Sequence, residues 1–291
     1  MLTNLTKIQM GILETLNSKW YESLLSKEII GLSKLSSTAV YDSIKELAKE
    51  NIVLESKGAY RINYSNDIAW AVKRLYDAFK VNVLPDKLKN KIFDIREKAN
   101  LHFGTNILCI LVFGSASSGE LKENSDVDFL MILRERTDDI GFLRSLTSME
   151  KDFNIIQYSQ ESFMDSYDSG DDFIISVLKN HLALQGLDYL RYFLERDIPV
   201  VSKKTIHKRE QELLSLMKKI DKLLHENQPI AYDKIREFIK LKVRIMLMKS
   251  NIIPISRKNL FDLMKVRFKE YCQGYNKLTQ KNMHLVYSKL R

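Results

Sequence analysis

The chain has 291 residues, of which 45% are hydrophobic and 29% charged, and its formal net charge is +9. A chain of this length is expected to form roughly two domains and to bury a sizeable core. It contains no apolar run of about eighteen residues, which argues against a membrane-spanning helix. The two cysteines, Cys109 and Cys272, lie far apart and follow no zinc-ligand spacing, which indicates a reducing compartment. We therefore expect a cytoplasmic protein with no membrane partner.

The charge is distributed unevenly along the chain. Residues 1–64 carry a net charge of +1 and residues 65–105 a net charge of +3, whereas residues 106–200 carry −9 and residues 201–291 carry +14. An acidic middle segment suits metal binding, and a basic C-terminal segment suits an acidic or phosphate-bearing partner. Together with the element patterns below, these shifts predict four parts with those boundaries.

The first 64 residues predict a helix, a turn, a second helix and a hairpin. Apolar residues recur at helical spacing from Leu5 to Leu16, and a second amphipathic pattern covers 36–50. Lys57 and Gly58 then form a turn between two short strand-like runs. This order resembles a winged helix-turn-helix, with 36–50 as the recognition helix and 55–61 as the wing.

The resemblance implies DNA as a partner of this first part. We expect the groove-facing residues to be Ser37, Thr38, Tyr41 and Lys45, with Lys34, Lys57 and Arg61 on the phosphates. A DNA-binding module usually has a stronger basic surplus than +1, so packing or dimerisation through the same part remains an open alternative.

Two amphipathic helices are predicted next, at 67–79 and 86–103, separated by a segment that contains Pro85. On the first of them, the apolar residues Trp70, Val72, Leu75 and Phe79 are expected to be buried in the core. We name this part, 65–105, the linking helices.

The strongest signal for function lies at 107–133. Seven apolar residues, Ile107 to Phe113, predict a strand buried on both faces, and Gly114-Ser115 allows a sharp turn whose N–H groups and hydroxyl can approach phosphate oxygens. On the following strand, Asp126 and Asp128 are two residues apart and project from one face. Two adjacent carboxylates repel each other unless a cation neutralises them, so the pattern predicts a magnesium site beside a phosphate-binding turn.

These residues resemble the signature of the DNA polymerase beta nucleotidyltransferase superfamily, in its minimal nucleotidyltransferase type. The resemblance implies an α+β fold whose core, 106–200, is a mixed sheet with helices. It also implies transfer of a nucleoside monophosphate from an NTP to a hydroxyl, with release of pyrophosphate. In that reading Asp126 and Asp128 hold two Mg²⁺ ions, and Gly114 and Ser115 hold the triphosphate of the NTP substrate.

The superfamily usually supplies a third carboxylate from the next strand. The candidate strand here covers 153–159 and has no acidic residue inside it. By alternation, either Asp152 at its edge or Asn154 within it could occupy the catalytic position. With Asn154 there, the metal that activates the acceptor would be held more weakly. Further along the chain, residues 181–197 resemble the closing strand and helix of the superfamily's core.

Residues 201–291 predict a basic bundle of four helices, at 203–226, 231–250, 257–273 and 278–290, broken at Pro229, Pro254 and Gly274. The bundle resembles a HEPN-type helical domain, but it has no Arg followed four to six residues later by His, so RNA cleavage is not expected. Some of its basic residues form either a surface that faces RNA or a triphosphate, or an ordinary solvated face. These residues are Lys240, Lys242, Arg244, Lys249, Arg257 and Lys258.

The leading hypothesis is a Mg²⁺-dependent nucleotidyltransferase that moves an NMP, with AMP favoured, to a hydroxyl of a protein or RNA, in a toxin–antitoxin setting. The alternative is a DNA-binding transcriptional regulator whose degenerate nucleotidyltransferase domain senses nucleotide. A third option, modification of a small molecule of the aminoglycoside type, fits the appended N-terminal part and basic bundle less well. The sequence does not determine the oligomeric state.

Overall fold

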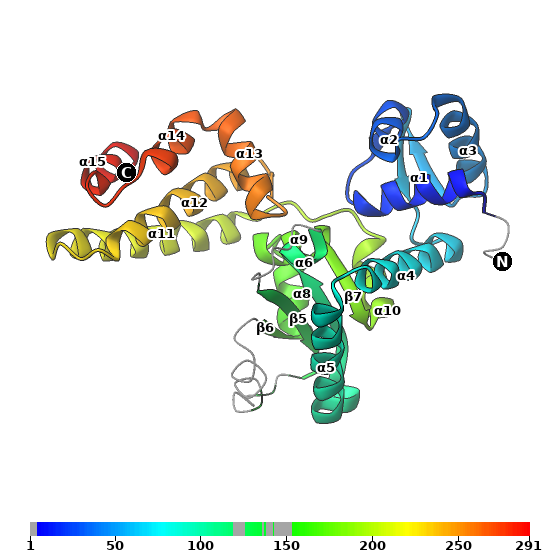
Figure 1. The fold of residues 1–291 in the computed structure, drawn as a ribbon, viewed down its shortest axis with the longest axis horizontal. Helices are drawn as coiled ribbons and strands as arrows, with labels where there is room; N and C mark the ends of the chain where they lie inside the picture. The colour runs from blue at the N-terminus through cyan, green and yellow to red at the C-terminus, as the bar shows by residue number, and fades with distance from the viewer. Residues whose placement is uncertain (1–4, 119–125, 136, 138–141, 143–152) are drawn as a thin grey trace. The chain divides into compact units, whose positions relative to one another are not determined.

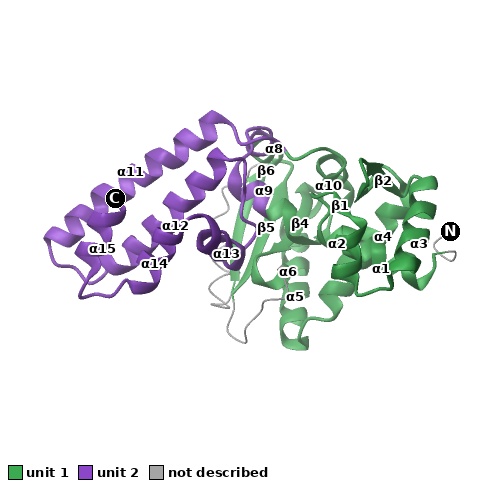
Figure 2. Cartoon of the chain, turned by 90° about the horizontal axis from the view of Figure 1, so that it is seen from above, with its two compact units in different colours: residues 1–164, 177–198 green, residues 165–176, 199–291 purple. Residues whose placement is uncertain are grey.

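The computed structural model describes residues 5–118, 126–135, 137, 142 and 153–291. The chain divides into two compact units (Figure 2). The first unit comprises Met1–Met164 and Val177–Ile198, and the second comprises Asp165–Ser176 and Pro199–Arg291. The finer four-part division expected from the charge pattern stays a prediction.

The first unit begins with helices packed on a small antiparallel sheet (Figure 1). The elements are α1 (Lys7–Ser18), β1 (Leu24–Leu25), α2 (Ser26–Ser33), α3 (Ser37–Lys49), β2 (Val53–Ser56) and β3 (Ala59–Ile62). The sheet order is β1-β3-β2. Ile12, Leu16, Ile44 and Leu47 are buried between the helices, as expected for amphipathic faces. The β2–β3 hairpin turns at Lys57 and Gly58, both with positive φ, which is the conformation that two-residue hairpin turns require.

Two longer helices follow, α4 (Asp67–Asn82) and α5 (Asp86–Phe103), and one expectation about α4 is wrong. Trp70 and Val72 are buried, but Leu75 and Phe79 are 50% and 61% exposed. The face that α4 buries instead includes Lys73 and Asp77, whose side chains form an ion pair that is almost fully buried. Because two charged residues occupy the buried face, the hydrophobic pattern alone gave the wrong orientation of the helix.

The centre of the first unit is a four-stranded mixed sheet, in the order β6-β5-β4-β7. Its strands are β4 (Ile107–Phe113), β5 (Val127–Leu133), β6 (Phe153–Ser159) and β7 (His181–Gln185). β4 is antiparallel to β5 and to β7, and β5 is parallel to β6. The mixed sheet and its helices confirm the α+β class.

The sheet is covered by helices because β4 is apolar throughout and β5 is apolar except for Asp128. Ile110, Val112, Phe129 and Met131 share one core with Ile95 and other residues of α5. The remaining elements up to residue 194 are the 3-10 turn η2 (Gly104–Asn106), α6 (Ser115–Ser118), α8 (Gln160–Asp168), α9 (Asp172–Lys179) and α10 (Leu187–Leu194). Of α8 and α9, the residues within 165–176 belong to the second unit. The apolar runs around the Gly-Ser turn are therefore central strands, as predicted.

The second unit is mostly helical. Its main helices are α11 (Lys203–His225), α12 (Ala231–Lys249), α13 (Arg257–Arg267), α14 (Lys269–Lys277) and α15 (Met283–Leu290). They enclose a core that includes Ile235, Phe238, Val243 and Met264. No helix in the described part of the chain is long and apolar enough to cross a membrane.

The expected break at Gly274 is wrong. The helix predicted at 257–273 ends at Arg267, and Gly274 lies inside α14. A Cβ on Gly274 would lie 2.4 Å from Cδ1 of Leu290 and 3.6 Å from Cγ1 of Val286, so the glycine is explained by close packing against α15. Its role is to let two helices approach each other, which the sequence pattern could not distinguish from a helix end.

Candidate active site

A row of four residues crosses one end of the mixed sheet. His181 of β7 pairs with Phe113 of β4, Phe113 pairs with Asp128 of β5, and Asp128 pairs with Asn154 of β6. β4 ends in this row, whereas the other three strands begin at it or one residue before it. Residues directly opposite each other on neighbouring strands share a face of the sheet. The sheet register therefore brings Asp128 and Asn154 together beside the turn that follows β4.

Gly114 begins that turn and lies very close to Asp128. Its φ is +72°, in the left-handed region that favours glycine. A Cβ at this position would lie 2.4 Å from Oδ2 of Asp128. The missing side chain thus makes room for the carboxylate, which is a reason for glycine that goes beyond backbone conformation.

Asp128 is half-buried and accepts a hydrogen bond from Nδ2 of Asn154, with 3.2 Å between Nδ2 and Oδ1. Burial raises the pKa of Asp128 above its usual value; the hydrogen bond from Asn154 opposes this shift, and the charge of Asp126 adds to it. Of the two candidates for the third catalytic position, Asn154 therefore lies beside Asp128. Asp152 lies outside the described residues.

Asp126 is exposed and lies two residues before Asp128, with the fully buried Val127 between them. Burial and a neighbouring charge both disfavour the carboxylate form of Asp128, and a bound cation would reverse that preference. Mg²⁺ commonly takes one or two carboxylates and completes its coordination with substrate phosphates and water. Asp126 and Asp128 fit such an ion. Within the described residues, no cluster of three or more His, Cys, Asp or Glu side chains could hold a metal by itself.

Ser115 is the first residue of α6, directly after Gly114. Ser117, which the sequence did not single out, fixes this turn to β7. Its Oγ lies 3.0 Å from the main-chain oxygen of Gly114 and 3.0 Å from that of Asn180, so its hydroxyl can donate to either. The only sequence signal was the run of small polar residues, which does not show which serine makes the contact.

His181 is buried, and its Nδ1 lies 2.7 Å from the main-chain oxygen of Leu178. Because a carbonyl oxygen only accepts hydrogen bonds, Nδ1 carries the proton. Burial lowers the pKa of His181 well below its usual value, and the charge of Lys73 lowers it further. His181 is thus a neutral structural residue of the sheet edge.

The residues predicted to bind nucleic acid lie on the N-terminal elements. Ser37, Thr38, Tyr41 and Lys45 are exposed on α3, and Lys57 is exposed at the hairpin turn. A further member of the set is less available. Arg61 of β3 donates from Nη1 to Oδ1 of Asp197 over 2.6 Å, so part of its charge is already compensated.

Residues 90–180 match the family model described as Polymerase beta, Nucleotidyltransferase. The matched segment includes β4, β5 and β6, and with them Gly114, Asp128 and Asn154, whereas His181 lies one residue beyond it. The chain therefore carries a region of the polymerase beta nucleotidyltransferase type.

Several solved structures resemble the chain, among them the following two. One is a nucleotidyltransferase-like protein from Exiguobacterium sibiricum 255-15, with 9% identity and a TM-score of 0.37, over 67% of this chain and 73% of that chain. The other is the spectinomycin adenyltransferase AAD(9) from Enterococcus faecialis, solved with ATP and spectinomycin, with 18% identity and a TM-score of 0.41, over 69% and 96%. No curated protein matches the chain. At these values neither structure assigns a substrate to this chain.

Proposed function

We propose that the chain is a Mg²⁺-dependent nucleotidyltransferase that moves an NMP from an NTP to a hydroxyl group. The proposal rests chiefly on one observation: Asp128, next to Asp126, lies against the side-chain-free face of Gly114 at the end of a central strand. The family match at 90–180 supports the reaction class. In this site Asp126 and Asp128 would bind the metal, and Gly114 and Ser115 would bind the triphosphate.

The reaction forms a bond between the acceptor oxygen and the α-phosphorus and breaks the bond between that phosphorus and the pyrophosphate oxygen. The acceptor hydroxyl loses its proton to the solvent, and pyrophosphate leaves. A divalent cation held by the carboxylates supplies Lewis-acid chemistry, because it lowers the pKa of the hydroxyl and neutralises the leaving group. The chain's own contribution is to hold the two carboxylates and the phosphate turn in a fixed relation.

Asn154 lies at a candidate position for the third carboxylate, and this leads to a prediction about the rate of NMP transfer. Its amide currently donates to Asp128, so it adds no negative charge to the site. Asn154→Asp is expected to increase NMP transfer at limiting Mg²⁺, because a third carboxylate would strengthen binding of the activating ion. Asn154→Ala serves as the control for simple loss of the hydrogen bond. A lower rate for Asn154→Asp than for Asn154→Ala would contradict the assignment of this position.

We propose AMP as the transferred group and a protein or RNA hydroxyl as the acceptor, in a toxin–antitoxin setting. Incubation of the chain with α-labelled NTPs and, separately, total RNA, candidate partner proteins and aminoglycosides tests this proposal. Label is expected on RNA or protein with wild-type chain and not with Asp126→Ala. Label on aminoglycosides alone would mean that the acceptor is a small molecule and not RNA or protein. Transfer retained by Asp126→Ala would refute the assignment of Asp126 as a metal ligand.

A second candidate function is DNA-binding regulation with the nucleotidyltransferase region sensing nucleotide. Two observations favour it: the exposed set on α3, which includes Tyr41 and Lys45, and the amide of Asn154 at the third position. The order of α1 to β3 and the β1-β3-β2 sheet support a winged helix for the N-terminal part. This function predicts salt-sensitive binding to a promoter fragment that Lys45→Ala weakens, and NTP binding without pyrophosphate release.

A further inference from the structure

We call the second unit, residues 165–176 and 199–291, the helical unit. Its basic residues differ in how far their charges are already compensated. Nζ of Lys242 donates to the main-chain oxygens of Leu290 and Arg291, each over 2.7 Å. Lys249 pairs with Glu210 over 2.8 Å. These two lysines therefore have structural partners inside the unit. Lys240 and Arg244 are different, and both line the same cavity.

This cavity has a volume of about 360 Å³ and lies between α12 and the beginning of α13. Four of its lining residues come from one face of α12, at the spacing of successive helical turns, and two come from the start of α13. The lining residues are Glu237, Lys240, Leu241, Arg244, Ser256 and Leu260.

Lys240 is the uncompensated cation of this cavity. In the part of the chain that the structure describes, its side chain makes no hydrogen bond, ion pair or ring contact. Glu237 does not neutralise it, because both carboxylate oxygens of Glu237 accept from Nζ of Lys234, over 3.0 and 2.8 Å. Lys240 and Arg244 are one helical turn apart, where like charges repel each other. A bound anion would remove this repulsion.

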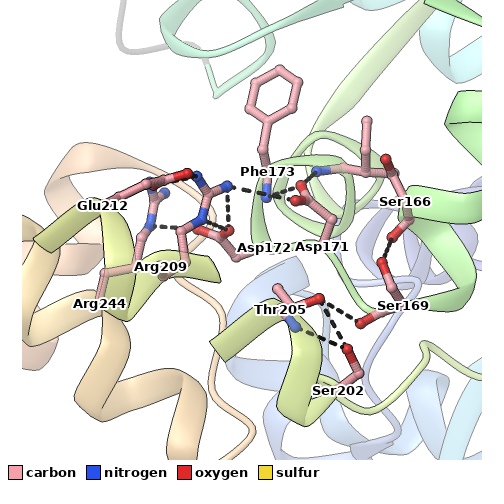
Figure 3. A network of polar contacts seen from close by, with 11 residues as sticks. Ser166, Ser169, Asp171, Asp172, Phe173, Ser202, Thr205, Arg209, Glu212 and Arg244 are labelled. Atoms are coloured by element: carbon pink, nitrogen blue, oxygen red, sulfur yellow. Dashed lines mark hydrogen bonds and ion pairs between the residues drawn. The ribbon is translucent and has the colours of Figure 1, made fainter. Parts of the chain in front are cut away.

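The guanidinium of Arg244 is restrained by an ion pair with a buried carboxylate, and the geometry of this pair is not that of a hydrogen bond. Nε of Arg244 lies 3.2 Å from Oδ2 of Asp172, whose side chain is 1% exposed. The other oxygen of Asp172 accepts from Arg209 over 2.6 to 2.7 Å, as Figure 3 shows. The side chain of Arg244 is nevertheless 36% exposed, so the contact through Nε leaves the outer guanidinium available. A guanidinium fixed in this way loses little freedom when it binds an oxyanion.

The charged side chains of the cavity favour binding of a phosphate group. Its lining residues favour a phosphate within a polynucleotide strand over the phosphate of a free nucleotide. A guanidinium and an ammonium on adjacent turns suit phosphate oxygens. None of the described residues that line the cavity is aromatic, so these residues offer no surface on which a base would stack. Residues 201–291 also carry a net charge of +14, most of which a single small anion would leave uncompensated.

We propose that the helical unit binds a polynucleotide strand through its phosphates and that the cavity of Lys240 and Arg244 holds one of them. If the chain also carries out the proposed transfer reaction, strand binding at this site favours a nucleic acid over a protein as the acceptor. Only this conclusion about the acceptor rests on the proposed function. Binding itself does not depend on transfer.

The test is the affinity of the full-length chain for RNA in the presence of EDTA, measured by fluorescence anisotropy. The probe is a labelled single strand of about 20 nucleotides, longer than common site sizes of roughly 4–16 nucleotides. Lys240→Ala with Arg244→Ala is expected to weaken binding about tenfold or more at about 0.1 M salt and to reduce the salt slope by about 0.7 for each lost phosphate contact. Lys222→Ala is the control, because Lys222 is 76% exposed on α11 and does not line the cavity.

The same titration with DNA of equal sequence shows whether the strand must be RNA, and either strand fits the proposal. Equal loss of affinity in the double variant and in Lys222→Ala would overturn it, since the effect would then be one of general charge. Loss of ATP affinity with unchanged strand binding would also overturn it, because the cavity would then hold a free nucleotide. Asp126→Ala is expected to bind the strand normally, so a failure of NMP transfer and a failure of this site can be told apart.

Discussion

Replacing Gly114 by alanine tests the close approach of the phosphate turn to Asp128. Alanine in the left-handed region costs about 1–2 kcal/mol of stability. The new Cβ would lie 2.4 Å from Oδ2 of Asp128, and real contacts open to at least 3.0–3.4 Å. The carboxylate must therefore retreat. A displacement on the order of 1 Å in a catalytic group costs about 10²-fold in rate, or about 2.7 kcal/mol in the barrier.

The assay is label transfer from α-labelled NTP at saturating Mg²⁺, together with chemical denaturation of the same variant. Gly58→Ala is the matched control, because Gly58 has a φ of +76° and an added Cβ would meet nothing within 4 Å. Both variants are expected to lose similar stability, but only Gly114→Ala should lose transfer. Full activity in Gly114→Ala, or an equal loss of activity in Gly58→Ala, would refute the reasoning.

Two further predictions concern the stability of the first unit. Lys73→Met should cost about 3–5 kcal/mol in denaturant unfolding, because it leaves the buried carboxylate of Asp77 without its partner. Adding Asp77→Asn should recover most of this loss, since the amide oxygen can still accept the hydrogen bond from the N–H of Ala183; no recovery would mean that the charge is not the cause. Because the pKa of His181 lies below 6.5 in the folded chain, the unfolded chain takes up the proton first, and stability should fall as the pH drops below 6.5. His181→Asn should reduce that pH dependence in thermal unfolding, and an unchanged profile would assign it to other groups.

The central strands were predictable because nearly all of their residues are apolar, whereas the roles of the site residues stay a prediction. β4 is apolar without interruption, so its burial on both faces followed from the sequence, and β5 is apolar except for Asp128. The Gly-Ser turn and the Asp-x-Asp lie where these strands end or begin. The register across strands was not predictable in the same way. The sequence left Asp152 and Asn154 as alternatives, and the pairing of β5 with β6 was needed to set Asn154 beside Asp128.

The orientation of α4 and the role of Gly274 were mispredicted for a common physical reason. In both cases a long-range contact decides the local structure. The buried face of α4 includes the charged residues Lys73 and Asp77, which can be buried because they neutralise each other and because Asp77 also accepts a hydrogen bond from the N–H of Ala183 on β7. Gly274 lies inside α14, and its lack of a side chain is explained by α15, which packs where a Cβ would be. The hydrophobic pattern along a single helix does not show which residues of other elements will contact that helix.

The most direct test of the central claim is metal binding at the two carboxylates in the presence of nucleotide. Mn²⁺ replaces Mg²⁺ as an observable ion, and its binding to the full-length chain can be followed by electron paramagnetic resonance with and without ATP. Wild-type chain is expected to bind Mn²⁺ more tightly when ATP is present, and both Asp126→Ala and Asp128→Asn should abolish that gain. Unchanged ATP-dependent Mn²⁺ binding in the two variants would contradict the assignment of the site.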